Sequence, residues 1–118
     1  MTHNQTLGAR GEQLAADHLE ALGMEILTRN WRCREGELDI VARDGADLVC
    51  VEVKTRSTTS FGHPFEAVTA QKLSRLRRLA ALWCQASDAS ARCIRIDVVS
   101  VLDHGAAGPV IEHLRGVN

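Results

Sequence analysis

The sequence predicts an α/β protein whose helices flank a mixed sheet of four or five strands. Two segments, residues 7–23 and about 64–86, repeat apolar residues at helical spacing. Five shorter segments are rich in Val, Ile and Leu and are bounded by turn residues, as β-strands are. Their order, one helix, three strands, one helix and two strands, is typical of a layered α/β domain.

Length and charge limit the function classes. A chain of 118 residues is long enough for one hydrophobic core, so we expect a single domain over residues 1–118. The net charge is −1, which gives no overall attraction to nucleic acid or to an acidic membrane. A polyanion would therefore have to meet a local basic patch.

The sequence also predicts a cytoplasmic protein without a membrane partner. No apolar run approaches the roughly 20 residues of a membrane span, and "MTHNQTLGARGEQ" lacks the apolar core of a signal peptide. The four cysteines form no CxxC pair, which favours reduced thiols over a structural zinc site.

The first helix and the strands that follow it have clear limits. "LGARGEQLAADHLEALG" places Leu7, Leu14, Leu19 and Leu22 at helical intervals, and Gly23 predicts a left-handed end to the helix. "MEILTRNWRC" predicts a short strand. "GELDIVARDGADLVCVEVKTRS" predicts two more strands that turn at "DGAD".

The second half of the chain predicts one helix and two strands. "STTSFGHP" is a polar loop, and from about Pro64 "PFEAVTAQKLSRLRRLAALWCQA" carries a stripe that includes Val68, Leu73 and Leu76. "RCIRIDVVSV" then alternates as a strand, and "VIEHL" can return beside it as a short edge strand.

The hairpin contains charged residues that need an explanation. If residues 45–46 form a type II′ turn, residues whose numbers sum to 91 face each other across the ladder. Asp39 then lies opposite Glu52, and Glu37 lies opposite Lys54. These four charges share one face. The other face is apolar and comprises Leu38, Ile40, Ala42, Val49, Val51 and Val53.

Three interpretations of this cluster compete. Lys54 can simply pair with Glu37 on a solvated face, for about 0.2–1 kcal/mol per pair. Asp39 and Glu52 can form a proton-transfer dyad of the glycosidase type, although two Trp and no Tyr provide few platforms for a sugar. The two carboxylates can also bind Mg²⁺, which prefers hard oxygen ligands and phosphate oxygens.

An Asp on one strand, Glu-x-Lys on the next and a Glu on a preceding helix resemble the PD-(D/E)xK nuclease superfamily. More narrowly, "GARGEQLAADHLEALG", "RNWRCREGELDIVARD", "VCVEVKTRS", "FGHPFEAVTAQK" and "RIDVVSV", in this order, resemble the YraN family of small bacterial proteins. The resemblance covers about residues 8–114. It implies a restriction-endonuclease-like fold, close to the Holliday-junction resolvase branch.

The resemblance also implies roles for individual residues. Asp39 and Glu52 would be the ligands of Mg²⁺ or Mn²⁺, with the Val53 carbonyl joining them. Lys54 would activate the attacking water and stabilise the transition state. Glu12 matches the helix carboxylate that completes the catalytic set and can join the metal ligands.

Two of these carboxylates are ambiguous from the residues alone. Glu12 shares a helix face with Ala15 and Leu19, where a charge is costly, yet we expect it in the early turns, where the helix dipole favours an anion. Glu37 is either an outer metal ligand or the partner of Lys54.

Basic residues predict how the protein would contact nucleic acid. Lys72 and three arginines, Arg75, Arg77 and Arg78, crowd the second helix, while Arg29, Arg32 and Arg34 precede the site strand. Such clusters can bind phosphates, although a solvated amphipathic helix has the same appearance. We assign nucleic-acid binding to Arg32, Arg34, Arg75 and Arg78. Gln71 and Lys72 are second-tier site residues, because related nucleases place a polar residue there.

The sequence therefore predicts a metal-dependent, endonuclease-like phosphodiester hydrolase that acts on DNA and selects its substrate by structure. The alternatives are a nucleic-acid-binding module of the same fold with weak or no catalysis, and a small protein-binding adaptor. The oligomeric state is left open, a homodimer included.

Overall fold

The computed structural model describes residues 3–57, 65, 68–103 and 108–117. In chain order the elements are α1 (His3–Ala21), β1 (Glu25–Cys33), β2 (Gly36–Asp44), β3 (Asp47–Arg56), α2 (Ala70–Ser87), β4 (Cys93–Asp103) and β5 (Pro109–Leu114). This order confirms the predicted α/β class. Most of the predicted loop at residues 57–64 lies outside the described residues.

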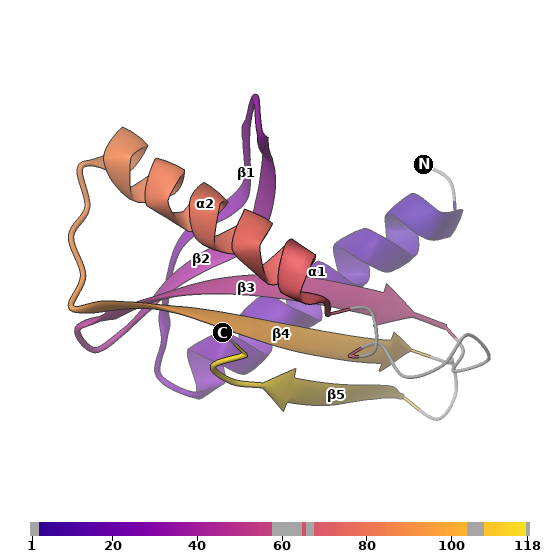
Figure 1. The fold of residues 1–118 in the computed structure, drawn as a ribbon. Coiled ribbons are helices and arrows are strands. Elements are labelled where there is room, and N and C mark those ends of the chain that lie inside the picture. The colour runs from indigo at the N-terminus through magenta and orange to yellow at the C-terminus, as the bar shows by residue number, and fades with distance from the viewer. Residues whose placement is uncertain (1–2, 58–64, 66–67, 104–107, 118) are drawn as a thin grey trace.

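The five strands form one mixed sheet in the order β1-β2-β3-β4-β5 (Figure 1). The β1–β2, β2–β3 and β4–β5 pairs are antiparallel, whereas β3 and β4 are parallel. Parallel neighbours need a crossover connection, and α2 lies in that connection. The predicted mixed sheet flanked by helices is therefore confirmed.

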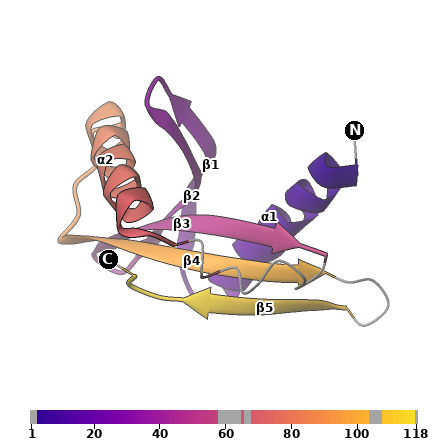
Figure 2. The same ribbon diagram turned by 45° about the vertical axis from the view of Figure 1, so that its right-hand side comes forward.

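The two helices cover opposite faces of the sheet (Figures 1 and 2). On one face, Ala15, Ala16 and Leu19 of α1 pack in a cluster with apolar residues of β2, β3 and β4. On the other face, Leu76 and Leu79 of α2 belong to a second cluster. The sheet is thus the middle layer of three, and its central strands are buried on both sides.

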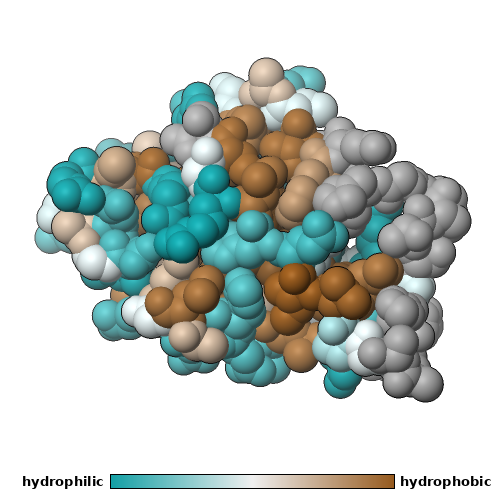
Figure 3. All heavy atoms as spheres, turned by 90° about the horizontal axis from the view of Figure 1, so that it is seen from below, coloured by the Kyte–Doolittle hydropathy of each residue, from teal (hydrophilic) through white to brown (hydrophobic). Residues whose placement is uncertain are grey.

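β5 is an edge strand, as predicted. Val110 and Leu114 on this strand are 48% and 39% exposed. Figure 3, seen from the side on which β5 lies in Figure 1, shows hydrophobic side chains gathered in patches that hydrophilic ones separate.

The end of α1 matches the sequence-based prediction in its left-handed glycine but not in its last helical residue. Gly23 has a φ of +91°, and the Met24 N–H donates to the Leu19 carbonyl at 3.1 Å, so the predicted left-handed end is confirmed. The assignment of Leu22 to the helix was wrong. Leu22 follows the last helical residue and is 49% exposed.

The start of α2 was also predicted wrongly. The helix begins at Ala70 rather than near residue 64, so Val68 precedes it. Thr69 is the N-cap: its backbone is extended and its hydroxyl accepts a hydrogen bond from the Lys72 N–H at 3.1 Å. That bond satisfies one of the free N–H groups of the first turn and fixes the position of Lys72.

The β2–β3 hairpin has the predicted register. Ile40 faces Val51 and Asp44 faces Asp47, so the partner numbers sum to 91. Of the two turn residues only Gly45 has a positive φ, at 63°, which agrees with a type II′ turn.

The regular β2–β3 pairing ends before it reaches the charged residues Asp39 and Glu37. In the part of the sheet that the structure describes, the β2–β3 ladder stops at Ile40 and does not include Asp39. The β1–β2 ladder also skips Asp39, which lies near Asn30, a residue with a left-handed φ of 54°. Beyond this irregularity β2 changes face: Leu38 packs with the α2 cluster, whereas Ile40 packs with the α1 cluster. The prediction that Leu38 and Ile40 share a face was therefore wrong.

Candidate active site

The candidate site lies where the ladder between β2 and β3 ends. There the Asp39 carboxylate turns toward β3, and its Oδ2 accepts a hydrogen bond from the Val53 N–H at 2.8 Å. Because the regular ladder has ended, this side chain takes the place of a backbone acceptor. Asp39 is thereby held between the two faces of the sheet and lines a cavity on each side.

Several acidic groups surround Asp39. Burial raises the pKa of Asp39 to about 6; the Val53 N–H opposes this shift, and the negative charges of Glu52, Glu12 and Glu37 add to it. Glu52 thus helps to raise the pKa of Asp39, which agrees in direction with the repulsion expected from the sequence, although the two residues are not a regular ladder pair. A cation bound here would relieve the repulsion.

Glu52 is held by two lysines from different elements. Its Oε1 lies 2.9 Å from the Lys72 Nζ of α2 and 3.6 Å from the Lys54 Nζ of β3. Its Oε2 is buried and has no hydrogen-bond partner among the described residues. One oxygen of Glu52 is thus neutralised, while the other is left to accept a ligand.

Lys54 does not have the partner that the regular ladder predicted. Glu37 pairs instead with Arg32 at 3.1 Å, and both of those side chains are exposed. Burial, together with the neighbouring Lys72, lowers the pKa of Lys54, and Glu52 opposes this shift. The pairing of Lys54 with Glu37 was therefore wrong, and Lys54 belongs to the Glu52 cluster.

Glu12 reaches the site because α1 approaches β3 very closely. Gly11 makes this approach possible: a Cβ added there would lie 2.7 Å from the Cβ of Thr55. The next residue, Glu12, is only 16% exposed in its side chain, and its buried Oε1 lacks a hydrogen-bond partner among the described residues. The Nε of Arg29 lies 3.9 Å from that oxygen.

The expected helix-dipole effect at Glu12 was wrong. α1 begins at His3, so Glu12 lies in the middle of the helix and not in its first turn. The dipole acts mainly within the first and last turns. The helix dipole therefore does not explain why Glu12 is found at this position. Glu12, Asp39 and Thr55 line one cavity together with Lys54.

The acidic residues meet some, but not all, of the requirements of a protein site for a divalent cation. The described residues include no group of three His, Cys, Asp or Glu side chains that could hold an ion. Mg²⁺ needs fewer, because it commonly uses one or two carboxylates and completes its shell with water and substrate oxygens. Glu52 Oε2 and Glu12 Oε1 are buried and have no hydrogen-bond partner among the described residues, so each could serve as a ligand oxygen for such an ion. A role for the Val53 carbonyl stays a prediction.

The predicted basic residues fall into two groups. A groove of about 600 Å³ runs along α2 and is lined by Thr69, Gln71, Lys72, Ser74, Arg75 and Arg78. Gln71 and Lys72 are thus brought together with Arg75 and Arg78. Arg32 and Arg34 lie in the β1–β2 hairpin instead, where Arg32 pairs with Glu37.

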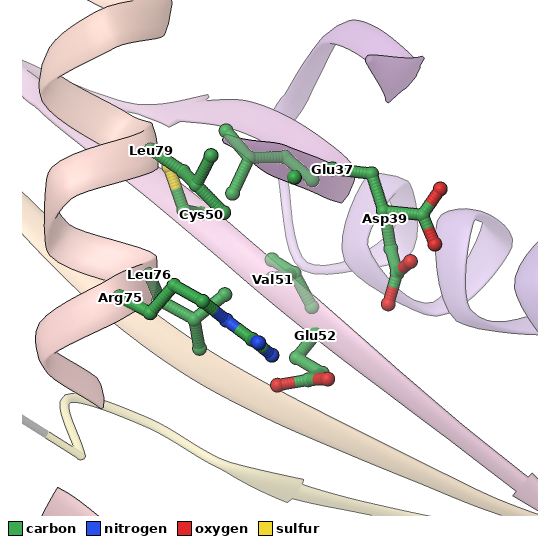
Figure 4. Close-up of a pocket in the computed structure, with 10 residues that line it drawn as sticks. Glu37, Asp39, Cys50, Val51, Glu52, Arg75, Leu76 and Leu79 are labelled. Carbon is green, nitrogen blue, oxygen red and sulfur yellow. The ribbon is translucent and has the colours of Figure 1, made fainter. Parts of the chain in front are cut away.

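Arg75 differs from Arg32 and Arg78, which each form an ion pair. Arg78 lies 3.8 Å from Glu35, but Arg75 makes no ion pair among the described residues. It lines both the α2 groove and the cavity beside Glu52. In Figure 4 its guanidinium points from α2 toward Glu52.

The sequence did not predict a second polar network on the α1 side of β4. Asp97 is fully buried and accepts hydrogen bonds from Arg95 and the Gly116 N–H, while its Oδ2 lies 2.7 Å from the Nε2 of His113. The His113 Nδ1 lies 3.1 Å from the Nε2 of His18 on α1. The available signal was a single Asp inside the apolar strand "CIRIDVVSV". This network links the C-terminal segment to α1 and lies outside the carboxylate–lysine cluster.

Fold and site together define a class: an α/β domain that carries carboxylates and lysines at a break in a mixed sheet. Sequence comparison identifies the family. Residues 11–101 match the model of a family described as "Uncharacterised protein family UPF0102". The chain belongs to this family, which is the YraN family that the motifs predicted.

Close relatives share nearly the whole chain. A UPF0102 protein of Arthrobacter sp. (strain FB24) is 58% identical over 117 residues, which cover 99% of each protein. A UPF0102 protein of Beutenbergia cavernae is 60% identical over 117 residues, with the same coverage. One from Nocardia farcinica is 56% identical over 113 residues, 96% of this chain and 89% of that protein.

The structure adds one finding about membranes. None of the helices in the described ranges is long and apolar enough to cross a bilayer.

Proposed function

We propose that this protein is a metal-dependent phosphodiester hydrolase that acts on DNA in the cytoplasm. The observation that supports this most is the arrangement at the break in the sheet. Asp39 and Glu12 line one cavity and Asp39 and Glu52 another, and two buried carboxylate oxygens there have no hydrogen-bond partner among the described residues. Buried polar oxygens are normally satisfied, so these two favour a cation as the missing partner.

Each residue of the cluster has a role in this proposal. Asp39 and Glu52 hold Mg²⁺ or Mn²⁺, with Glu12 as a further ligand from α1. The bound ion supplies an acidified water and polarises a phosphate oxygen. Lys54, whose ammonium lies 3.6 Å from Glu52, contacts the reacting phosphate and stabilises the charge that develops on it.

The α2 groove supports DNA as the substrate. Lys72, Arg75 and Arg78 line it, and the groove meets the cavity beside Glu52 at Arg75. A local basic surface can bind phosphates even though the whole chain carries a charge of only −1. Because these contacts go to the backbone, selection by DNA structure is favoured over selection by sequence.

One observation favours the alternative of a DNA-binding module without catalysis. Lys72 lies 2.9 Å from Glu52, so an internal cation already neutralises part of one proposed ligand. In that alternative the lysine replaces the metal, and the protein binds DNA without cutting it.

The experiment is a cleavage assay with labelled single-stranded, duplex, flapped and four-way DNA in Mg²⁺ and in Mn²⁺. Wild type should cut at least one branched substrate, and Glu52→Gln should lose both cleavage and metal binding. Glu20→Gln, which changes an exposed glutamate on α1, is the matched control and should behave as wild type. DNA binding without cleavage by wild type would favour the binding-module alternative. Sedimentation of the same samples would show whether the protein is a dimer.

A further inference from the structure

The most enclosed cavity near the site has two kinds of wall. It has a volume of about 230 Å³ and lies between α2, β3 and the tip of the β1–β2 hairpin. Its charged lining comes from Glu37, Asp39, Glu52 and Arg75. Its apolar lining comes from Leu38, Cys50, Val51, Leu76 and Leu79.

Part of the apolar lining, Leu79 and Cys50, is separated in space from the charged lining, whereas Leu76 and Val51 lie beside Arg75 and Glu52 (Figure 4). Figure 4 shows Arg75 and Glu52 pointing toward each other, whereas Leu79 and Cys50 lie away from the Asp39 and Glu52 carboxylates. A ligand that suits this cavity needs one charged end and one apolar end. The volume is below the roughly 300–1,000 Å³ of pockets that hold drug-sized ligands, so the apolar end has to be small.

Gly36 keeps the cavity open at the hairpin tip. Its φ is +148°, and a Cβ added there would lie 3.4 Å from the Leu79 Cδ1. A side chain at this position would therefore occupy space beside Leu79. The glycine therefore leaves space at the apolar end of the cavity.

Arg75 provides the binding group for the charged end. It makes no ion pair in the part of the chain that the structure describes, although Glu52 is close to it. The planar guanidinium matches the oxygens of a phosphate and can donate two parallel hydrogen bonds. Arg75 also continues into the α2 groove with Lys72 and Arg78, where neighbouring phosphates can lie.

We propose that this cavity receives one unstacked nucleobase while the adjoining phosphate lies on Arg75. The substrate class is then DNA with an unpaired nucleotide next to the phosphate at the site, as in a bulge, flap or junction. The inference rests on the proposed function and adds the reason for structure selectivity. A stacked base pair is too large for the cavity, whereas an extruded base can lie against apolar side chains.

The test measures binding in EDTA, where no metal-dependent cleavage occurs. Three fluorescein-labelled DNA duplexes are compared by anisotropy: one with a single unpaired 2-aminopurine, one with an abasic residue at that position, and one fully paired. We expect the unpaired base to bind roughly tenfold more tightly than the abasic residue, the scale of burying part of one base against apolar side chains. The 2-aminopurine fluorescence should rise on binding as the base leaves its neighbours.

Variants on α2 test whether this cavity is the place where the base binds. Leu76→Phe adds volume to the cavity lining and should remove the difference between base and abasic DNA without changing the affinity for abasic DNA. Leu82→Phe, on the same helix but outside the cavity lining, is the control and should keep the difference. Arg75→Gln should weaken binding of all three duplexes and reduce its dependence on salt.

Equal affinity of wild type for base and abasic DNA would overturn the inference. If Leu76→Phe fails to fold, this wild-type comparison decides alone. Preference for the unpaired base without any cleavage in Mn²⁺ would refute the proposed hydrolysis but keep the base cavity. Cleavage without a preference for the unpaired base would support the proposed hydrolysis and refute the base cavity.

Discussion

Replacing Asp39 with asparagine should stabilise the metal-free protein at neutral pH. The pKa of this carboxyl is raised from 3.8 to about 6 because it is buried and lies among other acidic groups. Ionising it in the folded protein is therefore unfavourable. Asparagine removes the charge, and its amide oxygen can still accept the hydrogen bond from the Val53 N–H.

The size of the effect follows from linkage between protonation and folding. The rise of the pKa from 3.8 to about 6 corresponds to about 3 kcal/mol, since one pKa unit is about 1.36 kcal/mol. Asp39 is only partly buried, so solvent screening reduces this and we expect about 1–3 kcal/mol. The folded state holds the proton more tightly, so wild type loses this stability as the pH rises from about 4 to 6. The advantage of the variant should therefore be small at pH 4 and full above pH 6.

Urea denaturation in EDTA at pH 4.5, 6 and 7.5 measures this difference. Asp17→Asn is the matched control, because Asp17 is exposed and accepts a hydrogen bond from the Gln13 amide. The control should change the free energy of unfolding by less than about 0.5 kcal/mol. If Asp39→Asn instead destabilises the metal-free protein by more than 1 kcal/mol, the carboxylate has a structural role and the reasoning fails.

Three further predictions concern the supports of the site and the second network. Gly11→Ala should force α1 away from Thr55 and lower the free energy of unfolding by about 1–3 kcal/mol. The control Gly8→Ala, whose added Cβ would meet nothing within 4 Å, should be neutral or stabilising. Thermal melts compare the two variants, and equal effects on stability would contradict the close approach of α1 to β3. Thr69→Ala should cost about 1 kcal/mol by removing the N-cap of α2, and Thr69→Ser should restore most of it; an alanine variant as stable as wild type would refute the capping role. Burial and a neighbouring histidine lower the pKa of His18 below 6.5, so its contribution to stability is present above pH 6.5 and is lost as the pH falls below it. Melting temperatures at pH 5.5 and 7.5 should therefore differ more for wild type than for His18→Gln, and identical pH dependences would argue against this.

The sequence was sufficient to predict the parts of the fold that depend on local pattern. The two-residue turn at Gly45 fixed the hairpin register, which fixes every pair from Ile40 to Asp44. Gly23 marked the end of α1, and alternation marked β4 and the edge strand β5.

The details of the site depend on tertiary contacts that no local pattern encodes. The ladder ends at Ile40, Asn30 on the neighbouring strand has a left-handed backbone, and Asp39 accepts a hydrogen bond from the Val53 N–H; a regular register cannot predict these features. The pairing of Lys72 with Glu52 joins α2 to β3 and depends on where α2 begins. That start was predicted too early because the apolar spacing continues N-terminal to Thr69, which is the actual cap.

The most direct test of the proposed function separates metal binding from cleavage with Lys54→Met. Mn²⁺ affinity by calorimetry and cleavage of a labelled branched DNA are measured side by side for wild type, Lys54→Met and Glu52→Gln. Lys54→Met should bind Mn²⁺ nearly as well as wild type but cut at least roughly 100-fold more slowly, the scale of one lost charge contact in the transition state. Glu52→Gln should already fail at metal binding. Equal cleavage by all three proteins, or a wild type that neither binds Mn²⁺ nor cuts, would contradict the proposed hydrolysis.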